Sequence, residues 1–280
     1  MNFLSKNVTP LIGGLGRIGG TKIKTPKGSM YLKKTGTEWQ DVKVIRSMYD
    51  LGINFFDTAE LYGWGYGEYL LGEALKNKPR DSFVVATKIF RIEEEDIKEA
   101  VIKKGRDMLD RLGTSYVDVL YLHEPYEPME DYIEGLLKLS MRGLIRSIGF
   151  SRFSLEQLKK AERILGRYWT LISIVQSSFS IAERRFLPEE LLKYCRHKQI
   201  HVAGFRPLLN VLQNSTIKQK LSKLTEKYNA TPAQIAISWV RSRNIIPIVR
   251  SHNVSHIKEN IEALNIKLER KDIAILDRLV

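Results

Sequence analysis

Residues 52–63 carry the clearest structural signal of this 280-residue chain: Gly52-Ile53-Asn54-Phe55-Phe56-Asp57-Thr58-Ala59-Glu60-Leu61-Tyr62-Gly63. The apolar run from Ile53 to Phe56 predicts a short buried strand that stops at the carboxylate of Asp57. Tyr62 follows five residues later in a glycine-containing loop. Barrels and doubly wound sheets keep their chemistry at the carboxyl ends of strands. On these residues alone, the alternative is that Asp57 caps the next helix and Tyr62 only packs against its neighbours.

The composition is that of a globular protein, with 43% hydrophobic and 28% charged residues. No apolar run approaches the roughly 20 residues of a membrane span, and residues 1–10 lack the apolar core of a secretory signal. The single cysteine, Cys195, excludes an internal disulfide and fits the reducing cytoplasm. Its helical surroundings predict a structural thiol rather than a nucleophile. We therefore expect a cytoplasmic protein.

The net charge is +13, from 45 Lys and Arg against 32 Asp and Glu. Such an excess can indicate a nucleic acid, an anionic membrane surface or a phosphorylated ligand. The basic residues are spread along the chain and share their helical segments with Glu and Asp, as on an ordinary solvated face. We therefore expect neither a nucleic-acid nor a membrane partner, and assign a few of the cations to a phosphate-bearing cofactor.

Short apolar segments alternate with helical patterns along the chain. The predicted strands are 11–20 (with the loop that follows), 53–56, 83–87, 117–122, 144–150, 171–175, 200–204 and 245–249. The predicted helices are 38–51 capped by Thr37, 68–76, a long one ending near 112, 130–141, one capped by Ser154, 188–197, 216–228, 232–243 capped by Thr231, 254–264 and 270–279. Residues 21–37 are expected to form a polar loop.

Near-continuous apolar strands of this kind are typical of parallel sheets covered on both faces. The glycine-rich residues 11–20 lack the helix that a dinucleotide-binding fingerprint must open, which argues against an open sheet. No linker-like change of composition divides the chain. The sequence therefore predicts an α/β fold, a single-domain (β/α)₈ TIM barrel with extra C-terminal helices that spans residues 1–280.

Polar side chains follow most of the predicted strands. They are Asp57, Lys88, His123, Ser151 with Arg152, Gln176, Arg206 after Phe205, and Arg250 with Ser251. One polar residue at a strand end is an ordinary cap or turn former. In a barrel, however, all these positions face one mouth, so the set predicts a common site.

The combination of Asp57, Tyr62, Lys88 and His123 favours proton transfer over metal binding. Only Asp57 and His123 would suit a metal, and Lys88 would repel it, so we expect no metal. A tyrosine has an ordinary pKa of ~10, which a nearby ammonium lowers by stabilising the phenolate. Asp57 would hold Lys88 in place, and His123 would orient a substrate oxygen. Such a set protonates an alkoxide as it forms, as in carbonyl reduction with a hydride-donating cofactor.

The same residues resemble those of the aldo-keto reductases, and the resemblance covers essentially the whole chain. The matching segments are 52–63 with Glu68, Ala86-Thr87-Lys88, Asp118-Val119-Leu120-Tyr121-Leu122-His123, Gly149-Phe150-Ser151, Val175-Gln176, Pro207-Leu208 and Glu259-Asn260. The first three, in this order and spacing, are the most specific. The resemblance implies a (β/α)₈ barrel, a nicotinamide cofactor and the tetrad Asp57, Tyr62, Lys88 and His123, with Tyr62 as proton donor.

The resemblance also implies a cofactor site. Its residues would be Gly16, Arg17, Ile18 and Asp57; Ser151, Arg152 and Gln176 at the nicotinamide carboxamide; Phe205 stacked on the ring; Arg206, Pro207 and Leu208 along the pyrophosphate; Arg250, Ser251 and His256 near the 2′-phosphate; and Glu259 and Asn260 at the adenine.

Three residues depart from the family pattern. Arg152 stands where the family usually has asparagine, and a guanidinium cannot accept a hydrogen bond from an amide. His256 replaces a common arginine, which weakens the preference for NADP(H). Arg250 replaces lysine but keeps the charge and can bind phosphate in bidentate fashion. We expect NADP(H) to be favoured over NAD(H).

The substrate is expected to be a small carbonyl or alcohol compound: an aldehyde, a ketone or a sugar. The chain ends directly after its last predicted helix, so the resemblance implies a site open on one side, lined by Tyr62, Trp64, His123, Tyr126 and residues near Arg17. Two alternatives remain at this point. One is a cofactor-binding regulatory module of the same fold, and the other is a lyase or isomerase that uses Lys88 as a Schiff base.

Overall fold

Eight parallel strands close into a barrel in the computed structural model, which describes residues 1–16, 18, 20–25, 28–33, 36–211 and 213–279. In order around the barrel, the strands are β3 (Ile12–Gly14), β6 (Phe55–Asp57), β7 (Val84–Ile89), β8 (Val117–Leu122), β9 (Ile145–Ser151), β10 (Ile172–Ser178), β11 (His201–Phe205) and β12 (Ile246–Val249). The pairing of β12 with β3 closes the ring. The predicted barrel is confirmed.

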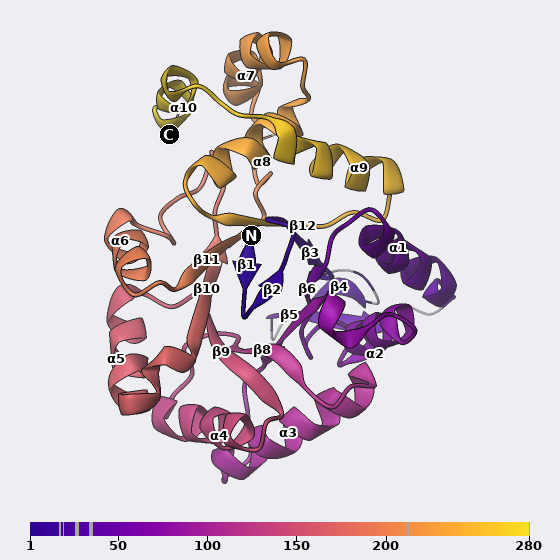
Figure 1. Ribbon diagram of the computed structural model, residues 1–280, viewed down its shortest axis with the longest axis vertical. Coiled ribbons are helices and arrows are strands. Elements are labelled where there is room, and N and C mark those ends of the chain that lie inside the picture. The colour runs from indigo at the N-terminus through magenta and orange to yellow at the C-terminus, as the bar shows by residue number, and fades with distance from the viewer. Residues whose placement is uncertain (17, 19, 26–27, 34–35, 212, 280) are drawn as a thin grey trace.

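Helices surround the barrel, as Figure 1 shows. They are α1 (Glu38–Asp50), α2 (Tyr66–Leu75), α3 (Ile97–Leu112), α4 (Met129–Met141), α5 (Leu155–Leu165), α6 (Glu189–His197), α7 (Ser215–Tyr228), α8 (Pro232–Ser242), α9 (Val254–Glu262) and α10 (Arg270–Asp277), with short 3₁₀ turns at Arg80–Ser82, Gly166–Leu171 and Ala263–Asn265. In Figure 1, α7 and α10 lie beyond α8, outside the ring. The two helices predicted to end the chain are α9 and α10. None of the described helices is long and apolar enough to cross a bilayer.

Two of the three predicted helix caps form as expected. Ser154 and Thr231 each accept a hydrogen bond from the backbone three residues on, and Gln157 and Gln234 return one, which completes a capping box at each helix. Thr37 precedes α1 but does not cap it, because its hydroxyl donates to the Asp41 carboxylate at 3.1 Å.

Two antiparallel hairpins precede the first helix, and neither is predicted. The strands β1 (Asn2–Phe3) and β2 (Lys6–Asn7) form one, and β4 (Gly20–Thr25) and β5 (Gly28–Lys33) form the other. The expectation of a polar loop over residues 21–37 is therefore wrong. A two-stranded ribbon requires no long apolar run, so its polar composition resembled that of a loop.

The β1–β2 hairpin closes the amino end of the barrel. The ring of Phe3 lies 5.0 Å from that of Phe55, among the apolar side chains of the barrel interior. Lys6 reaches the buried carboxylate of Asp118 at 2.7 Å, and Figure 1 shows the hairpin in the middle of the ring. In the part of the chain that the structure describes, the hairpin thus leaves the carboxyl ends of the strands for a ligand to approach, which is where the predicted site residues lie.

Candidate active site

Lys88 and Asp57 form a buried ion pair between neighbouring strands β7 and β6. Lys88 Nζ lies 2.6 Å from Asp57 Oδ1 and also donates to the carbonyl oxygen of Thr58 at 2.6 Å. Gln176 on β10 donates from Nε2 to the other carboxylate oxygen at 3.2 Å. Only 2% of the Lys88 side chain and 6% of the Asp57 side chain are exposed, so each charge depends on these partners.

Tyr62 meets Lys88 at this ion pair. Lys88 Nζ lies 5.3 Å from the centre of the phenol ring and is hydrogen-bonded to the phenol. Burial alone disfavours the ammonium, but Asp57 and Tyr62 together outweigh it, so the pKa of Lys88 is raised above its ordinary value. Lys88 is therefore an ammonium at neutral pH.

His123 completes the group from the end of β8. Its ring stands edge-on to that of Tyr62, with the ring centres 6.4 Å apart. Burial, and then the charges of Lys88 and Arg152, hold the pKa of His123 well below its ordinary value. The imidazole is therefore neutral, and its buried Nδ1 has no hydrogen-bond partner among the described residues.

The loop that carries Tyr62 is held from two sides. Within the loop, the carbonyl oxygen of Tyr62 accepts from the backbone N–H of Gly67 at 2.9 Å. At the start of α2, the buried Glu68 carboxylate accepts from Thr87 Oγ1 on β7 at 2.5 Å and from Arg111 Nε on α3 at 2.7 Å. Thr87 directly precedes Lys88, so Glu68 connects the phenol-bearing loop to the lysine-bearing strand.

Gly65 at the N-cap of α2 must be glycine. Its φ of 88° lies in the left-handed region, and a Cβ there would come within 2.4 Å of the Arg111 side chain. The glycine thus allows Arg111 to reach Glu68 across the helix start.

The ends of β9, β10 and β11 bring together the side chains expected at the nicotinamide. Ser151 and Gln176 are buried and paired in register across β9 and β10. Arg152 has a φ of 63°, and its guanidinium carbon lies 5.6 Å from the centre of the Phe205 ring. Arg206, with a φ of 57°, approaches the same ring to 5.8 Å. The Phe205 ring therefore lies near two cations, at strand ends that also carry a buried hydroxyl and a buried amide.

Arg152 has a partner that the sequence does not single out. Its Nη1 donates to Glu124 Oε1 at 2.8 Å, from the loop that follows His123. The only sequence signal for Glu124 is its position directly after a strand-end histidine. Phe90 is also missed, although it lies two residues after Lys88, with its ring 5.9 Å from that of His123.

The residues expected at the rest of the cofactor lie on the last two strands and helices. Pro207 is buried and Leu208 half-buried after β11, while Arg250 is exposed at the end of β12. Ser251 Oγ accepts from the backbone N–H of Asn253 at 3.0 Å, and His256 is exposed on α9.

Two further residues of this set already have structural roles. Glu259 accepts a hydrogen bond from the Thr231 hydroxyl, which ties α9 to α8. Asn260 is buried on the same helix, so only part of α9 faces outward.

Near the first strand, Gly16 lies against the phenol, because a Cβ there would be 3.7 Å from the Tyr62 hydroxyl. Ile18 is buried, whereas Arg17 lies outside the described residues. Of the expected substrate contacts, Trp64 is 54% exposed in the Tyr62 loop. The Tyr126 ring lies 6.0 Å from Phe90, in the wall that includes His123.

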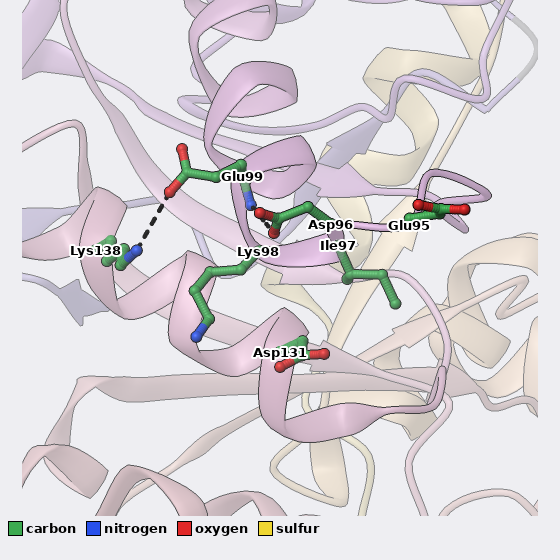
Figure 2. Close-up of a pocket in the computed structure, with 7 residues that line it drawn as sticks. All are labelled: Glu95, Asp96, Ile97, Lys98, Glu99, Asp131 and Lys138. Atoms are coloured by element: carbon green, nitrogen blue, oxygen red, sulfur yellow. Dashed lines mark hydrogen bonds and ion pairs between the residues drawn. The ribbon is translucent and has the colours of Figure 1, made fainter.

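A separate hollow of about 430 Å³ lies outside the barrel, between the start of α3 and α4 (Figure 2). Its charged side chains have structural roles: Asp96 caps α3 by accepting from the backbone N–H of Glu99, and Glu99 pairs with Lys138 at 3.3 Å. Within the described parts of the chain, no cluster of three or more His, Cys, Asp or Glu could hold a metal. Cys195 is buried on α6, which raises the pKa of its thiol to about 12, as expected of a structural thiol.

Comparison with known proteins gives a consistent result. The sequence model of the Aldo/keto reductase family matches residues 26–280. A probable aldo-keto reductase 1 of Glycine max is 30% identical over 276 residues, covering 84% of this chain and 78% of the relative. The methylglyoxal reductase DkgB of Escherichia coli O157:H7 is 25% identical over 246 residues, covering 84% and 87%.

Solved structures agree with the sequence comparison. A thermostable aldo-keto reductase crystallised with the inhibitor epalrestat superposes with a TM-score of 0.87 at 25% identity, covering 99% of this chain and 97% of the other. An aldo/keto reductase of Klebsiella pneumoniae in complex with NADP and acetate gives a TM-score of 0.79 at 25% identity, covering 98% and 95%. With the barrel and the family match together, the chain belongs to the aldo/keto reductase family.

Proposed function

We propose that this oxidoreductase interconverts small carbonyl compounds and alcohols with NADP(H), and that Tyr62 is the proton donor to the carbonyl oxygen. The observation that carries the proposal is the buried Lys88 ammonium, held between the Asp57 carboxylate and the Tyr62 phenol beside a neutral His123. The name of the relative from Escherichia coli, a methylglyoxal reductase, supports a small carbonyl substrate.

Each residue has one task in this mechanism. Lys88 stabilises the phenolate that remains when Tyr62 gives up its proton, and Asp57 keeps Lys88 charged and in place. His123, as a neutral imidazole, hydrogen-bonds the substrate oxygen and orients the carbonyl. When bound, the nicotinamide cofactor supplies the hydride.

The residues at the mouth fit such a cofactor. Phe205 offers an aromatic face, and the buried Ser178 hydroxyl beside it has no partner among the described residues, so a polar ligand group could satisfy it. Arg206 and Arg250 are exposed cations that suit phosphate groups. The complex of the Klebsiella pneumoniae structure with NADP supports NADP(H) as the cofactor, and we propose that it is favoured over NAD(H). We further propose that residues 1–280 form one domain that acts in the cytoplasm.

The structure disfavours the Schiff-base alternative. A lysine that attacks a carbonyl must lose its proton, which requires a lowered pKa. The pKa of Lys88 is instead raised by Asp57 and Tyr62 against the effect of burial. A regulatory module of the same fold remains a competing outcome of the experiment that follows.

Replacing Tyr62 by Phe tests the proposal, because it removes only the hydroxyl. We expect turnover of NADPH with a panel of small aldehydes and ketones to fall by about 10²–10⁴-fold. The NADPH dissociation constant, measured by quenching of tryptophan fluorescence, is expected to stay unchanged. Tyr69→Phe, at a 47% exposed position on α2, is the matched control.

Unchanged turnover in Tyr62→Phe would reject the mechanism. Tight NADPH binding by the wild type without turnover of any carbonyl on the panel would favour the regulatory module instead.

A further inference from the structure

The ion pair between Arg152 and Glu124 lies where the family pattern expects an amide side chain. Arg152 follows Ser151 at the end of β9, and Glu124 follows His123 at the end of β8, so the pair bridges two neighbouring strand ends. Both side chains remain accessible, at 45% and 40% exposure. The pair is therefore available to a ligand that lies on Phe205.

A primary carboxamide offers one acceptor oxygen and an NH₂ group with two donors. The Arg152 guanidinium can donate to the oxygen but cannot accept from the NH₂. Gln176 has already used its own NH₂ on Asp57, so it can offer only its Oε1, which accepts from one of the two N–H groups and leaves the other to a second acceptor. Glu124 brings an acceptor to the guanidinium: Oε1 accepts from Arg152, and no hydrogen bond to Oε2 is seen among the described residues. Together the two side chains match both halves of an amide.

The charge of the pair disfavours the competing use of Arg152 as a phosphate ligand. An anion within reach of the guanidinium would also lie close to the Glu124 carboxylate, which repels it. A neutral, dipolar group that both donates and accepts suits the pair better. Arg206, for which no carboxylate partner is found in the described residues, is the cation left for phosphate.

We infer that Glu124 and Arg152 act together as the clamp for the nicotinamide carboxamide, with Glu124 accepting from its NH₂ and Arg152 donating to its oxygen. This inference rests on the proposed function, since it assigns a residue to the same cofactor site. Glu124 is then a cofactor-binding residue that acts through its pairing with Arg152.

The 3-acetylpyridine analogue of NADP⁺ separates the two contacts, because it keeps the carbonyl oxygen and has a methyl group in place of the NH₂. In Glu124→Met, we expect the dissociation constant for NADP⁺ to rise about tenfold, because a charge-assisted hydrogen bond to the NH₂ is lost. The dissociation constant for the analogue, which has no NH₂, is expected to change by less than about twofold. In Arg152→Met, both constants are expected to rise. The ratio of the two constants removes the general effect of the changed net charge.

Two further variants complete the experiment. Glu124→Gln keeps an acceptor oxygen and is expected to fall between the wild type and Glu124→Met. Glu130→Met on α4, which removes an exposed ion pair with Lys160 on α5, is the matched control and is expected to leave both constants unchanged.

An equal rise of the dissociation constants for NADP⁺ and the analogue in Glu124→Met would overturn the inference, because Glu124 would then act only by orienting Arg152. Unchanged NADP⁺ binding in that variant would overturn it as well, while leaving the proposed function intact. Failure of the wild type to bind NADP⁺ or NADPH would instead reject the proposed function and the clamp together.

Discussion

Lys88 and His123 show how neighbouring groups give opposite charge states to two buried bases in one site. Burial disfavours the charged form of both residues. Lys88 keeps its proton because Asp57 and Tyr62 compensate, whereas His123 faces the cations Lys88 and Arg152 and has its pKa lowered. The result is one fixed positive charge next to the phenol and one neutral hydrogen-bonding group beside it.

The lowered pKa of His123 predicts a loss of stability in acid. Below its ordinary value of about 6.5, the unfolded chain binds a proton that the folded chain does not, so the free energy of unfolding falls as the pH falls. The contribution of one such group is at most about 1.4 kcal/mol per pH unit. Urea unfolding of the wild type and His123→Gln between pH 7 and 5 measures it, and the variant is expected to lose less stability.

His197→Gln, at an exposed position on α6, serves as the control and is expected to follow the wild type. Parallel pH curves for the wild type and His123→Gln would contradict the assignment of a buried neutral imidazole.

At the scale of elements, the phenol and the ammonium meet because α2, α3 and β7 are fixed to one another. Glu68 on α2 contacts Thr87 on β7 and Arg111 on α3, and Lys104 on α3 pairs with Glu60 in the Tyr62 loop at 2.6 Å. These contacts lie behind the loop and leave Tyr62 itself half-buried at the mouth. Helix α3 therefore supports the Tyr62 loop, although the two are not adjacent in the sequence.

Removing the Glu68 side chain tests this support. Glu68→Ala leaves a buried hydroxyl and a guanidinium without their carboxylate, so we expect the free energy of unfolding to fall by about 3 kcal/mol. Turnover is expected to fall as well, because Tyr62 and Lys88 lose their common anchor. Glu73→Ala, which breaks an exposed ion pair between α2 and Lys76 at its C-cap, should cost less than about 1 kcal/mol.

Urea unfolding and steady-state kinetics of the two variants check this prediction. Equal destabilisation by Glu68→Ala and Glu73→Ala would show that the buried carboxylate has no special role.

For the whole molecule, the β1–β2 hairpin closes the amino end of the barrel, and the candidate site lies at the carboxyl end. Phe3 is 1% exposed and packs against Phe55 and His201, with both ring distances at 5.0 Å. Lys6 fixes the hairpin through Asp118, which also binds Arg80 at 2.7 Å. The hairpin thus contributes to stability at the end opposite the candidate site.

Phe3→Ala separates stability from activity. The loss of a fully buried ring is expected to lower the free energy of unfolding by about 3–5 kcal/mol. The turnover number at temperatures where the variant is folded is expected to stay within about twofold of the wild type, because the mouth is unchanged. Leu4→Ala, at the neighbouring 38% exposed position, should change stability by less than about 0.5 kcal/mol.

Denaturant unfolding and carbonyl reduction assays measure the two effects. A turnover number well outside that twofold range in folded Phe3→Ala would show that the hairpin and the mouth are coupled through the barrel interior.

The sequence alone determined the barrel strands, the positions of most helices and the polar residues at the strand ends. Apolar runs and helix caps are local signals, and the carboxyl ends of parallel strands must meet at one mouth, so Asp57, Lys88 and His123 could be placed near each other without coordinates. The β4–β5 hairpin was missed because its polar sequence carries no apolar period.

Only the tertiary structure decided which side chains pair across that mouth. The contact of Arg152 with Glu124, and the position of Phe90 beside His123, join residues from different strands. Such contacts depend on the direction of each side chain and on the register of neighbouring strands, which no local pattern encodes. The sequence therefore indicated where the chemistry lies, and the packing of the barrel determined which charges neutralise one another there.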